Sequence, residues 1–386
     1  MAKVRPRANE CIELLKTEAI VNNLSQVNLK KLHTTDRNQN RQTLLSQSIA
    51  SSDTNQLSKA NSDSINFNSL AVNWSKKYYS LVVASKNQTR GLILQNPLSI
   101  HRPENRSQIV EKLSDTLKVA SEIAWRKVEA ILGEEIECHG IDSRLINPVE
   151  IVSNTRHLYS KAIDAYGDLE SVSRLSVLVG RPIIELRRKY SQLDPLVLGF
   201  VTLEFQLTQK ILLGCLSELE RTQFAPYLKI VDDYLHIPYG EINQAAANLP
   251  TNSQALLAVQ HLLPHTTQIA NAVYDRATEH HQGYRSSSGY LTDEDVKISG
   301  IRDIEIFQNY LCWCVLEDSF RPVQQELFPI CVMLYPKLHV SWELVQDMLL
   351  ILFWEISDRL AAEDLIVFLP YLRTVTEMFS SDVFEN

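Results

Sequence analysis

The chain has 386 residues, with 38 lysines and arginines against 46 aspartates and glutamates, which gives a formal net charge of −8. At 45% hydrophobic content it is long enough to bury a core, and its negative charge disfavours nucleic acid as a partner. The chain has 11 glycines among its 386 residues, a much smaller share than the usual ~7%. This scarcity disfavours phosphate-binding glycine loops and glycine-turned β-sandwiches. The composition therefore predicts a mostly helical, all-α protein.

The N-terminal quarter of the chain differs in composition from the rest. From Asp36 to Ser75 it is rich in serine, asparagine and glutamine, and it has too few apolar side chains to offset the entropy of ordering. We therefore expect residues 1–105 to be largely disordered or of low complexity. The first residues lack the apolar stretch of a signal peptide, and we expect no integral membrane segment. Six cysteines without a CxxC pair indicate reduced thiols and a cytoplasmic protein.

A change of pattern near residue 106 indicates where folded structure begins. Ile109, Leu113 and Leu117 open a series of apolar residues at helical spacing, which predicts a long helix with one apolar stripe. Asp194 followed by Pro195 is typical of a helix cap with proline in the first turn. We predict a helical domain over residues 106–221.

A basic cluster lies inside this predicted domain. Its members are Arg181, Arg187, Arg188 and Lys189. Such a cluster can bind phosphate or an acidic partner surface, but a solvated helix face is the more common explanation, and we favour it here.

The remainder of the chain also has helical periodicity, with short breaks. The predicted helices are Tyr239–Ala247, Ser253–Glu279, Val296–Asp318, Pro322–Tyr335, Ser341–Arg359 and Ala362 to the end. A polar loop from Gly283 to Tyr290 joins two of them. Glu279, His280 and His281 offer metal-capable groups, but neighbouring helical residues diverge by about 100°, so we predict no metal site there.

Several C-terminal segments, in order and spacing, resemble the phycobiliprotein family, the globin-like light-harvesting proteins of cyanobacteria and red algae. The segments are APYLKIVDDYLHIPYGEI (Ala225 to Ile242), QIANAVYDR (Gln268 to Arg276), GIRDIEIF from Gly300, and VSWELVQDM (Val340 to Met348). No single segment is diagnostic, so the resemblance rests on their succession over residues 222–386. It implies a globin-like domain preceded by a helical arm.

In this family the arm mediates assembly into pairs and rings. The resemblance therefore implies that the corresponding face of this chain contacts a partner. We assign this contact to Tyr227, Ile230, Tyr234 and Ile237. The expected partners are phycobiliproteins or other phycobilisome components, with a homodimer as a further alternative.

The resemblance also implies where a pigment would bind. Pigmented members attach a bilin through a cysteine two residues before an Arg-Asp pair, and this chain has Gly300 at that position. Glycine has no nucleophile, so a thioether cannot form there. Arg302 and Asp303 remain at positions that contact the bilin in the family. They form either a noncovalent ligand site or, as we favour, an ion pair on a solvated helix face.

Three functional hypotheses follow. The first is an unpigmented, cyanobacterial phycobiliprotein-like protein that acts by protein contact in phycobilisome assembly or regulation, in the cytoplasm or at the cytoplasmic face of the thylakoid. The second is a noncovalent carrier or sensor of a bilin or haem, with haem requiring His261 or His265 in the pocket. The third is an unrelated helical adaptor. We find no catalytic motif and predict no enzyme activity, no resident cofactor and no metal.

Overall fold

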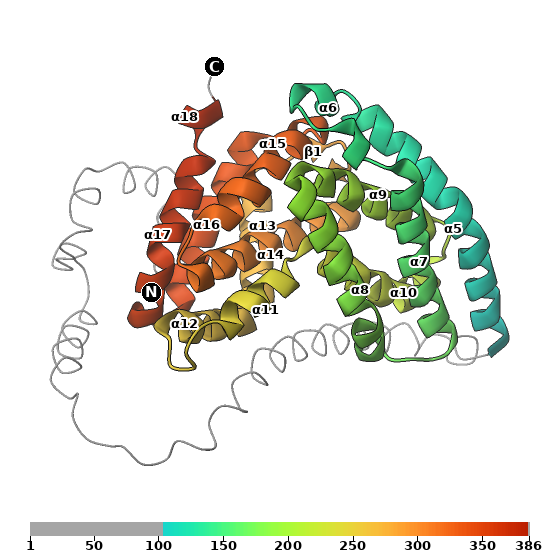
Figure 1. The fold of residues 1–386 in the computed structure, drawn as a ribbon, viewed down its shortest axis with the longest axis horizontal. Coiled ribbons are helices and arrows are strands. Elements are labelled where there is room, and N and C mark those ends of the chain that lie inside the picture. Colours follow the sequence, from blue (N-terminus) through green and yellow to red (C-terminus); the bar gives the residue numbers. More distant parts are fainter. Residues whose placement is uncertain (1–102, 385–386) are drawn as a thin grey trace, which may run out of the picture. The chain divides into compact units, whose positions relative to one another are not determined.

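The computed structural model describes residues 103–384, so the predicted low-complexity stretch 1–105 lies outside this range except for its last three residues, which open the first described helix. The described residues are almost entirely helical, which confirms the predicted all-α class (Figure 1). The exception is one short antiparallel hairpin, in which Arg285 pairs with Tyr290 and Ser286 pairs with Gly289.

The elements fall into two groups along the chain. The first group comprises α5 (Pro103–Leu132), α6 (Glu135–Cys138), the 3₁₀ turn η2 (Ser143–Leu145), α7 (Pro148–Gly167), α8 (Val172–Leu193), α9 (Pro195–Gly214) and α10 (Glu218–His236). The second comprises α11 (Tyr239–Ala247), α12 (Gln254–Leu262), η3 (Leu263–His265), α13 (Thr266–His280), β1 (Arg285–Ser286), β2 (Gly289–Tyr290), α14 (Glu294–Glu317), η4 (Val323–Leu327), α15 (Phe328–Lys337), α16 (Trp342–Arg359), α17 (Ala362–Met378) and α18 (Ser381–Phe384).

The first core is built by α5, α7, α8, α9 and α10. Fully buried side chains such as Leu113, Tyr159, Phe205 and Leu228 come from four of these helices. We call α5 to α9 the helical region and α10 the arm helix, because α10 packs along α7, α8 and α9. The core also takes in Met333 of α15, so the helical region is in direct contact with the C-terminal helices.

The second core is built by α11 to α17, which we call the C-terminal helices. It includes Val259, Leu311, Ile356 and Phe368. Helix α16 begins with a side-chain cap, in which Ser341 accepts a hydrogen bond from the backbone of Leu344, whereas Ser253 and Asp293 make no such bond at the starts of α12 and α14. The sequence patterns predicted these helices well because each has a clear apolar face.

Helix α9 has an apolar sequence because it lies at the centre of the first core. Among the described residues, this helix is long and apolar enough to cross a membrane. However, 61% of its apolar 18-residue stretch is buried inside the protein, as in a core helix. Glu204 lies within it, fully buried, and accepts hydrogen bonds from the hydroxyl groups of Thr155 and Thr208. Burial raises the pKa of Glu204 to about 8, although both threonines lower it, so the carboxyl group is largely protonated at neutral pH.

Three local features differ from the sequence prediction. The single helix predicted over Ser253–Glu279 is interrupted by η3, because Pro264 in this turn has no backbone N–H to donate. The polar loop Gly283–Tyr290 contains the β1–β2 hairpin. The helix predicted from Pro322 opens with a π-helical turn, η4, in which each turn takes in an extra residue compared with an α-helix.

Candidate functional site

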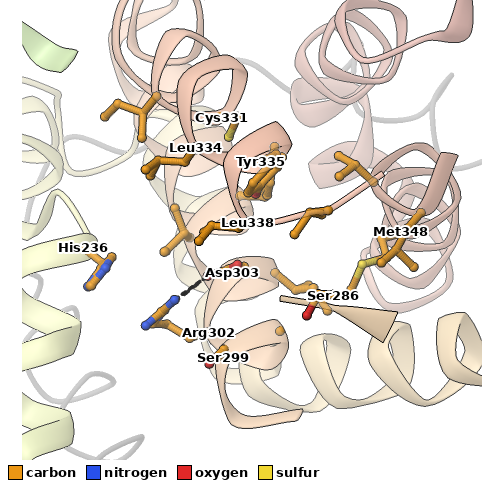
Figure 2. A pocket seen from close by; sticks show the side chains of 18 of the residues that line it. His236, Ser286, Ser299, Arg302, Asp303, Cys331, Leu334, Tyr335, Leu338 and Met348 are labelled. Atoms are coloured by element: carbon orange, nitrogen blue, oxygen red, sulfur yellow. Dashed lines mark hydrogen bonds and ion pairs between the residues drawn. The ribbon is translucent and has the colours of Figure 1, made fainter. Parts of the chain in front are cut away.

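Gly300, Arg302 and Asp303 lie on α14 and line one cavity of about 190 Å³. Its walls come from α9, from His236 of α10, and from α13 to α16 with the hairpin between them, and they are mainly apolar. Figure 2 shows Asp303 pointing toward the middle of the cavity, with Arg302 beside it on the side of His236. The structure therefore brings the three predicted residues together at one site.

The space in front of Gly300 is filled by Tyr274 of α13. A Cβ at position 300 would lie 2.7 Å from Cδ2 of Tyr274 and closer still to Cε2, so even alanine requires the ring to move. The ring is held in place because Tyr274 is 2% exposed and its hydroxyl donates a hydrogen bond to the backbone oxygen of Leu291 at 2.8 Å. Position 300 thus lacks both a thiol and the room for one.

Arg302 is already paired with two carboxylates. Its Nη2 lies 2.9 Å from Oδ1 of Asp303, and its Nη1 lies 3.3 Å from Oδ2 of Asp232 on the arm helix. Arg302 is only 8% exposed. This burial corrects our expectation that Arg302 lies on a solvated helix face. The physical reason is that Asp232 of α10 lies within reach of this side of α14 and supplies the second carboxylate.

Asp232 is the buried anion of this cluster. Burial by itself would raise its pKa, but Arg302 and then His236 lower the pKa well below the usual range of an aspartate. His236 is also part of the cavity wall, and its Nδ1 lies 3.1 Å from Oδ1 of Asp232. Asp232 is therefore charged near neutral pH, where it pairs with Arg302.

The cavity also contains a cysteine, Cys331 of α15, on the opposite side from Ser299 (Figure 2). Burial raises the pKa of its thiol to about 12, although its hydrogen bond with Tyr335 lowers it. The thiolate is the nucleophilic form, so Cys331 is unreactive near neutral pH.

Neither histidine considered as a haem ligand belongs to the wall of this cavity. His261 of α12 is 60% exposed at its side chain and binds Oδ2 of Asp364 through Nδ1 at 2.7 Å. His265 lies at the start of α13, outside the lining. His280 and His281 both contact Asp347, at 2.8 and 3.3 Å. Within residues 103–384, no group of three or more His, Cys, Asp or Glu side chains could hold a metal ion.

The four residues predicted to contact a partner are Tyr227, Ile230, Tyr234 and Ile237, on the arm helix and at its end. Ile230 is 1% exposed and belongs to the first core, and Ile237 is fully buried in the second. These two side chains are therefore not open to a second protein in this structure, whereas the sequence led us to expect a contact surface. The cause is that the helical region covers Ile230 and the C-terminal helices cover Ile237.

The two tyrosines of the arm helix are half-buried by the same helices. Tyr227 donates a hydrogen bond to the backbone oxygen of Glu170 at 2.6 Å, and its ring meets that of Tyr166 edge-on with centroids 5.5 Å apart. Tyr234 lies against Gly180 of α8, where a Cβ would be 2.9 Å from the ring carbon Cε1. The arm helix therefore makes its contacts with the chain's own helical region.

A second buried arginine, Arg187 of α8, was not recognised as a site residue from the sequence. Its side chain is 1% exposed and reaches the C-terminal helices, where it forms an ion pair with Glu326 of η4 and donates a hydrogen bond to the hydroxyl of Tyr310 at 2.8 Å. Its Nη1 lies 3.7 Å from Oε2 of Glu241. Burial would lower the pKa of Arg187, but Glu326, Tyr310 and Glu241 raise it above the ordinary value, so the group is charged.

The basic cluster thus divides into residues of two kinds. Arg181, with a side chain 88% exposed, pairs with Glu185 on the same helix, as a solvated face predicts. For Arg187 the prediction of a solvated face is wrong, because the acidic surface that it meets belongs to the chain itself. Its apolar neighbours Ile183 and Leu186 were the available sequence signal.

Comparison with known proteins assigns a family to the C-terminal helices. The family model described as phycobilisome protein matches residues 230–378. This match confirms the resemblance noted in the sequence and the globin-like class of the C-terminal domain. No curated protein and no solved structure matches the chain.

Proposed function

Since residues 230–378 belong to the phycobilisome protein family, we propose that the chain is an unpigmented phycobilisome-associated protein that acts by protein contact. Its role would be in assembly or regulation in the cytoplasm or at the cytoplasmic face of the thylakoid, without catalysis. The partners that fit this role are phycobiliproteins or other phycobilisome components.

The observation that carries the proposal is the filled space at Gly300. Covalent attachment requires a thiol at this position, and the ring of Tyr274 occupies the volume that its Cβ would need. The alternative thiol in the cavity, Cys331, has a pKa raised to about 12 by burial and is therefore a poor nucleophile. The absence of a usable thiol at position 300 and the raised pKa of Cys331 both support the unpigmented assignment.

An absorbance spectrum tests this proposal. The chain, purified from a bilin-producing host, should have no visible band after acid–urea denaturation and desalting. A phycobiliprotein from the same host, treated identically, is the matched control and should keep its band. A visible band that remains on the denatured chain would overturn the unpigmented assignment.

A second candidate, a noncovalent carrier of a bilin, is favoured by the cavity itself. It retains an apolar wall together with the Asp303 carboxylate, whose side chain is 37% exposed and points into it. Arg302 contributes less to this candidate, because Asp232 and Asp303 already bind it. The positions of His261 and His265 outside the lining give no support to haem ligation through either residue.

The carrier candidate is tested by titrating free bilin into the chain and into Asp303→Asn. A carrier should show a visible band that unfolding removes, and the variant should bind at least ~10-fold more weakly, because a charge-assisted hydrogen bond is worth about 1.5–3 kcal/mol. Asp295→Asn, at an exposed position of the same helix, is the control. Equal binding by all three proteins would exclude Asp303 as a ligand residue.

A further inference from the structure

We propose that the segment 283–291, which contains the β1–β2 hairpin, is a lid that closes the cavity at Asp303 and opens to admit an apolar molecule. The inference goes beyond the proposed function, because it concerns access to the cavity and holds with or without a pigment. Within residues 103–384, the lid and the turn between α15 and α16 are the parts of the cavity wall that are not helical. The lid residues in this wall are Tyr284, Ser286, Ser288 and Leu291.

The two ends of the lid are anchored to the C-terminal helices. At its start, His281 lies two residues before Gly283 and contacts Asp347 of α16 at 3.3 Å. At its end, the backbone oxygen of Leu291 accepts a hydrogen bond from the hydroxyl of Tyr274 at 2.8 Å, and the Leu291 side chain is buried in the second core. These contacts keep both ends in place when the middle of the lid moves.

The middle of the lid is held by hydrogen bonds to the turn between α15 and α16. Oγ and the backbone N–H of Ser287 both donate to the backbone oxygen of Leu338, at 2.7 and 3.1 Å. The Tyr284 hydroxyl donates to the backbone oxygen of His339 at 2.8 Å and accepts from the backbone N–H of Ser341 at 2.7 Å. The two bonds that these side chains donate lie at the exposed surface, where water can replace them. Each therefore adds little net stability to the closed position.

The sequence of the lid also suits a segment that moves. Gly283 and Gly289 have φ of +79° and +140°, which glycine adopts without strain and other residues rarely adopt. Between them, Arg285, Ser287 and Ser288 are exposed. The helices of the cavity wall, in contrast, bury apolar side chains in the two cores, so moving them disrupts a core. The lid is therefore the part of the wall that opens most easily.

The other side of the cavity is closed by buried charges. Figure 2 shows His236 and Ser286 on opposite sides of Asp303. On the side of His236, Arg302 pairs with both Asp303 and Asp232, and Asp232 also contacts His236 at 3.1 Å. An opening there would separate buried ion pairs, which is costly. We therefore place the entrance between the lid and the turn that it contacts.

A thiol in the cavity wall provides the test. Cys331 lies in this wall and is 3% exposed, so a thiol reagent must enter the cavity to reach it. The full chain is treated with methyl methanethiosulfonate, and peptide mass spectrometry gives the labelling rate of each cysteine. Cys312 and Cys314 of α14 are fully buried and lie outside the cavity wall, so they report opening of the second core.

The lid variant is Tyr284→Phe with Ser287→Ala, which removes three hydrogen bonds to the turn and keeps the aromatic ring. Cys331 should be labelled at least ~10-fold faster than in the wild type, because losing these bonds raises the population of the open lid. The two α14 thiols should react as slowly as before. Ser288→Ala is the matched control, since it changes the same hairpin and removes no bond to the turn.

Two results would overturn the lid. The first is unchanged labelling of Cys331 in the lid variant. The second is acceleration of the α14 thiols by the same factor, which indicates general destabilisation. If the double variant loses its helical circular dichroism, Ser287→Ala alone replaces it, with labelling of Cys331 at least ~3-fold faster and the same two criteria.

A bulkier reagent, N-ethylmaleimide, separates opening of the whole lid from small local fluctuations. When the whole lid opens, both reagents should label Cys331 faster by the same factor in the lid variant. Acceleration of the smaller reagent alone would contradict the lid. Because the readout is a thiol in the wall, the outcome requires neither a pigment nor a protein partner, so it is independent of the proposed function.

Discussion

Arg187 and Arg302 are both buried and both connect helices distant in the sequence, but they are satisfied to different degrees. Arg302 binds two carboxylates, one at each end of its guanidinium, and one of them is partly exposed. Arg187 also pairs with two carboxylates, Glu326 and, at 3.7 Å, Glu241, but its Nε and Nη1 have no hydrogen bond within the described residues. The difference is that the Arg302 contacts are the better satisfied of the two, whereas the helical region and the arm helix are joined mainly by the apolar first core. Glu204, a third buried ionisable group, is stabilised without any arginine contact, through two hydroxyl groups.

The largest expected effect comes from removing Arg302. In Arg302→Met the buried Asp232 loses its main counter-charge, so the free energy of unfolding at pH 7 should fall by about 3–5 kcal/mol. Urea denaturation followed by circular dichroism measures this change. Adding Asp232→Asn should restore part of the stability, because the uncompensated anion is then absent. A loss below about 1 kcal/mol would show that Arg302 does not secure the arm helix.

The next effect concerns Glu204, the buried acid whose hydrogen bonds come from two threonine hydroxyl groups. The pKa of Glu204 is raised from 4.5 to about 8 in the folded chain, so between these values the folded chain retains a proton that the unfolded chain has released. Stability from this group is therefore fully present below pH 4.5 and is lost as pH rises toward 8. The wild type should lose about 3–4 kcal/mol more than Glu204→Gln between pH 5 and pH 8.

Denaturation at a series of pH values checks the prediction for Glu204. The measurement compares how steeply the free energy of unfolding changes with pH in the wild type and in Glu204→Gln. A general loss of stability in the variant would shift its whole curve without flattening it. Parallel curves for the two proteins would show that Glu204 is ionised in the folded chain at neutral pH.

The smallest effect is expected for the exposed partner of Arg302. Asp303 is 37% exposed at its side chain, and an ion pair in contact with solvent contributes about 0.2–1 kcal/mol. Asp303→Asn should therefore lower the free energy of unfolding by less than about 1 kcal/mol in the same urea assay. A loss comparable with that of Arg302→Met would show that both carboxylates are needed to hold the arginine.

The sequence predicted the C-terminal helices and the residues at the cavity because these depend on local patterns. Apolar periodicity marks each helix, and Gly300, Arg302 and Asp303 were found through the order of neighbouring segments. The structure adds that these three residues share one cavity with α9, which no local pattern shows.

What the sequence did not predict depends on contacts between distant helices. Ile230 and Ile237 are apolar residues on a helix, and the pattern alone does not tell whether the chain or a partner covers them. Arg187 stands in a basic run, and its burial follows from the position of Glu326, 139 residues away. Tyr274 fills the space at Gly300 from another helix. Each of these facts requires the tertiary arrangement.

The π-helical turn η4 makes the position of Glu326 depend on the number of residues in the chain as well as on their identity. Each residue of an α-helix turns the chain by about 100°. Deleting one residue from Val323–Leu327 would therefore rotate the part of the chain before the deletion by about 100° relative to α15. The Glu326 carboxylate would then no longer face α8. A change of chain length in this turn is therefore expected to break the Arg187–Glu326 ion pair even when every charged side chain is kept.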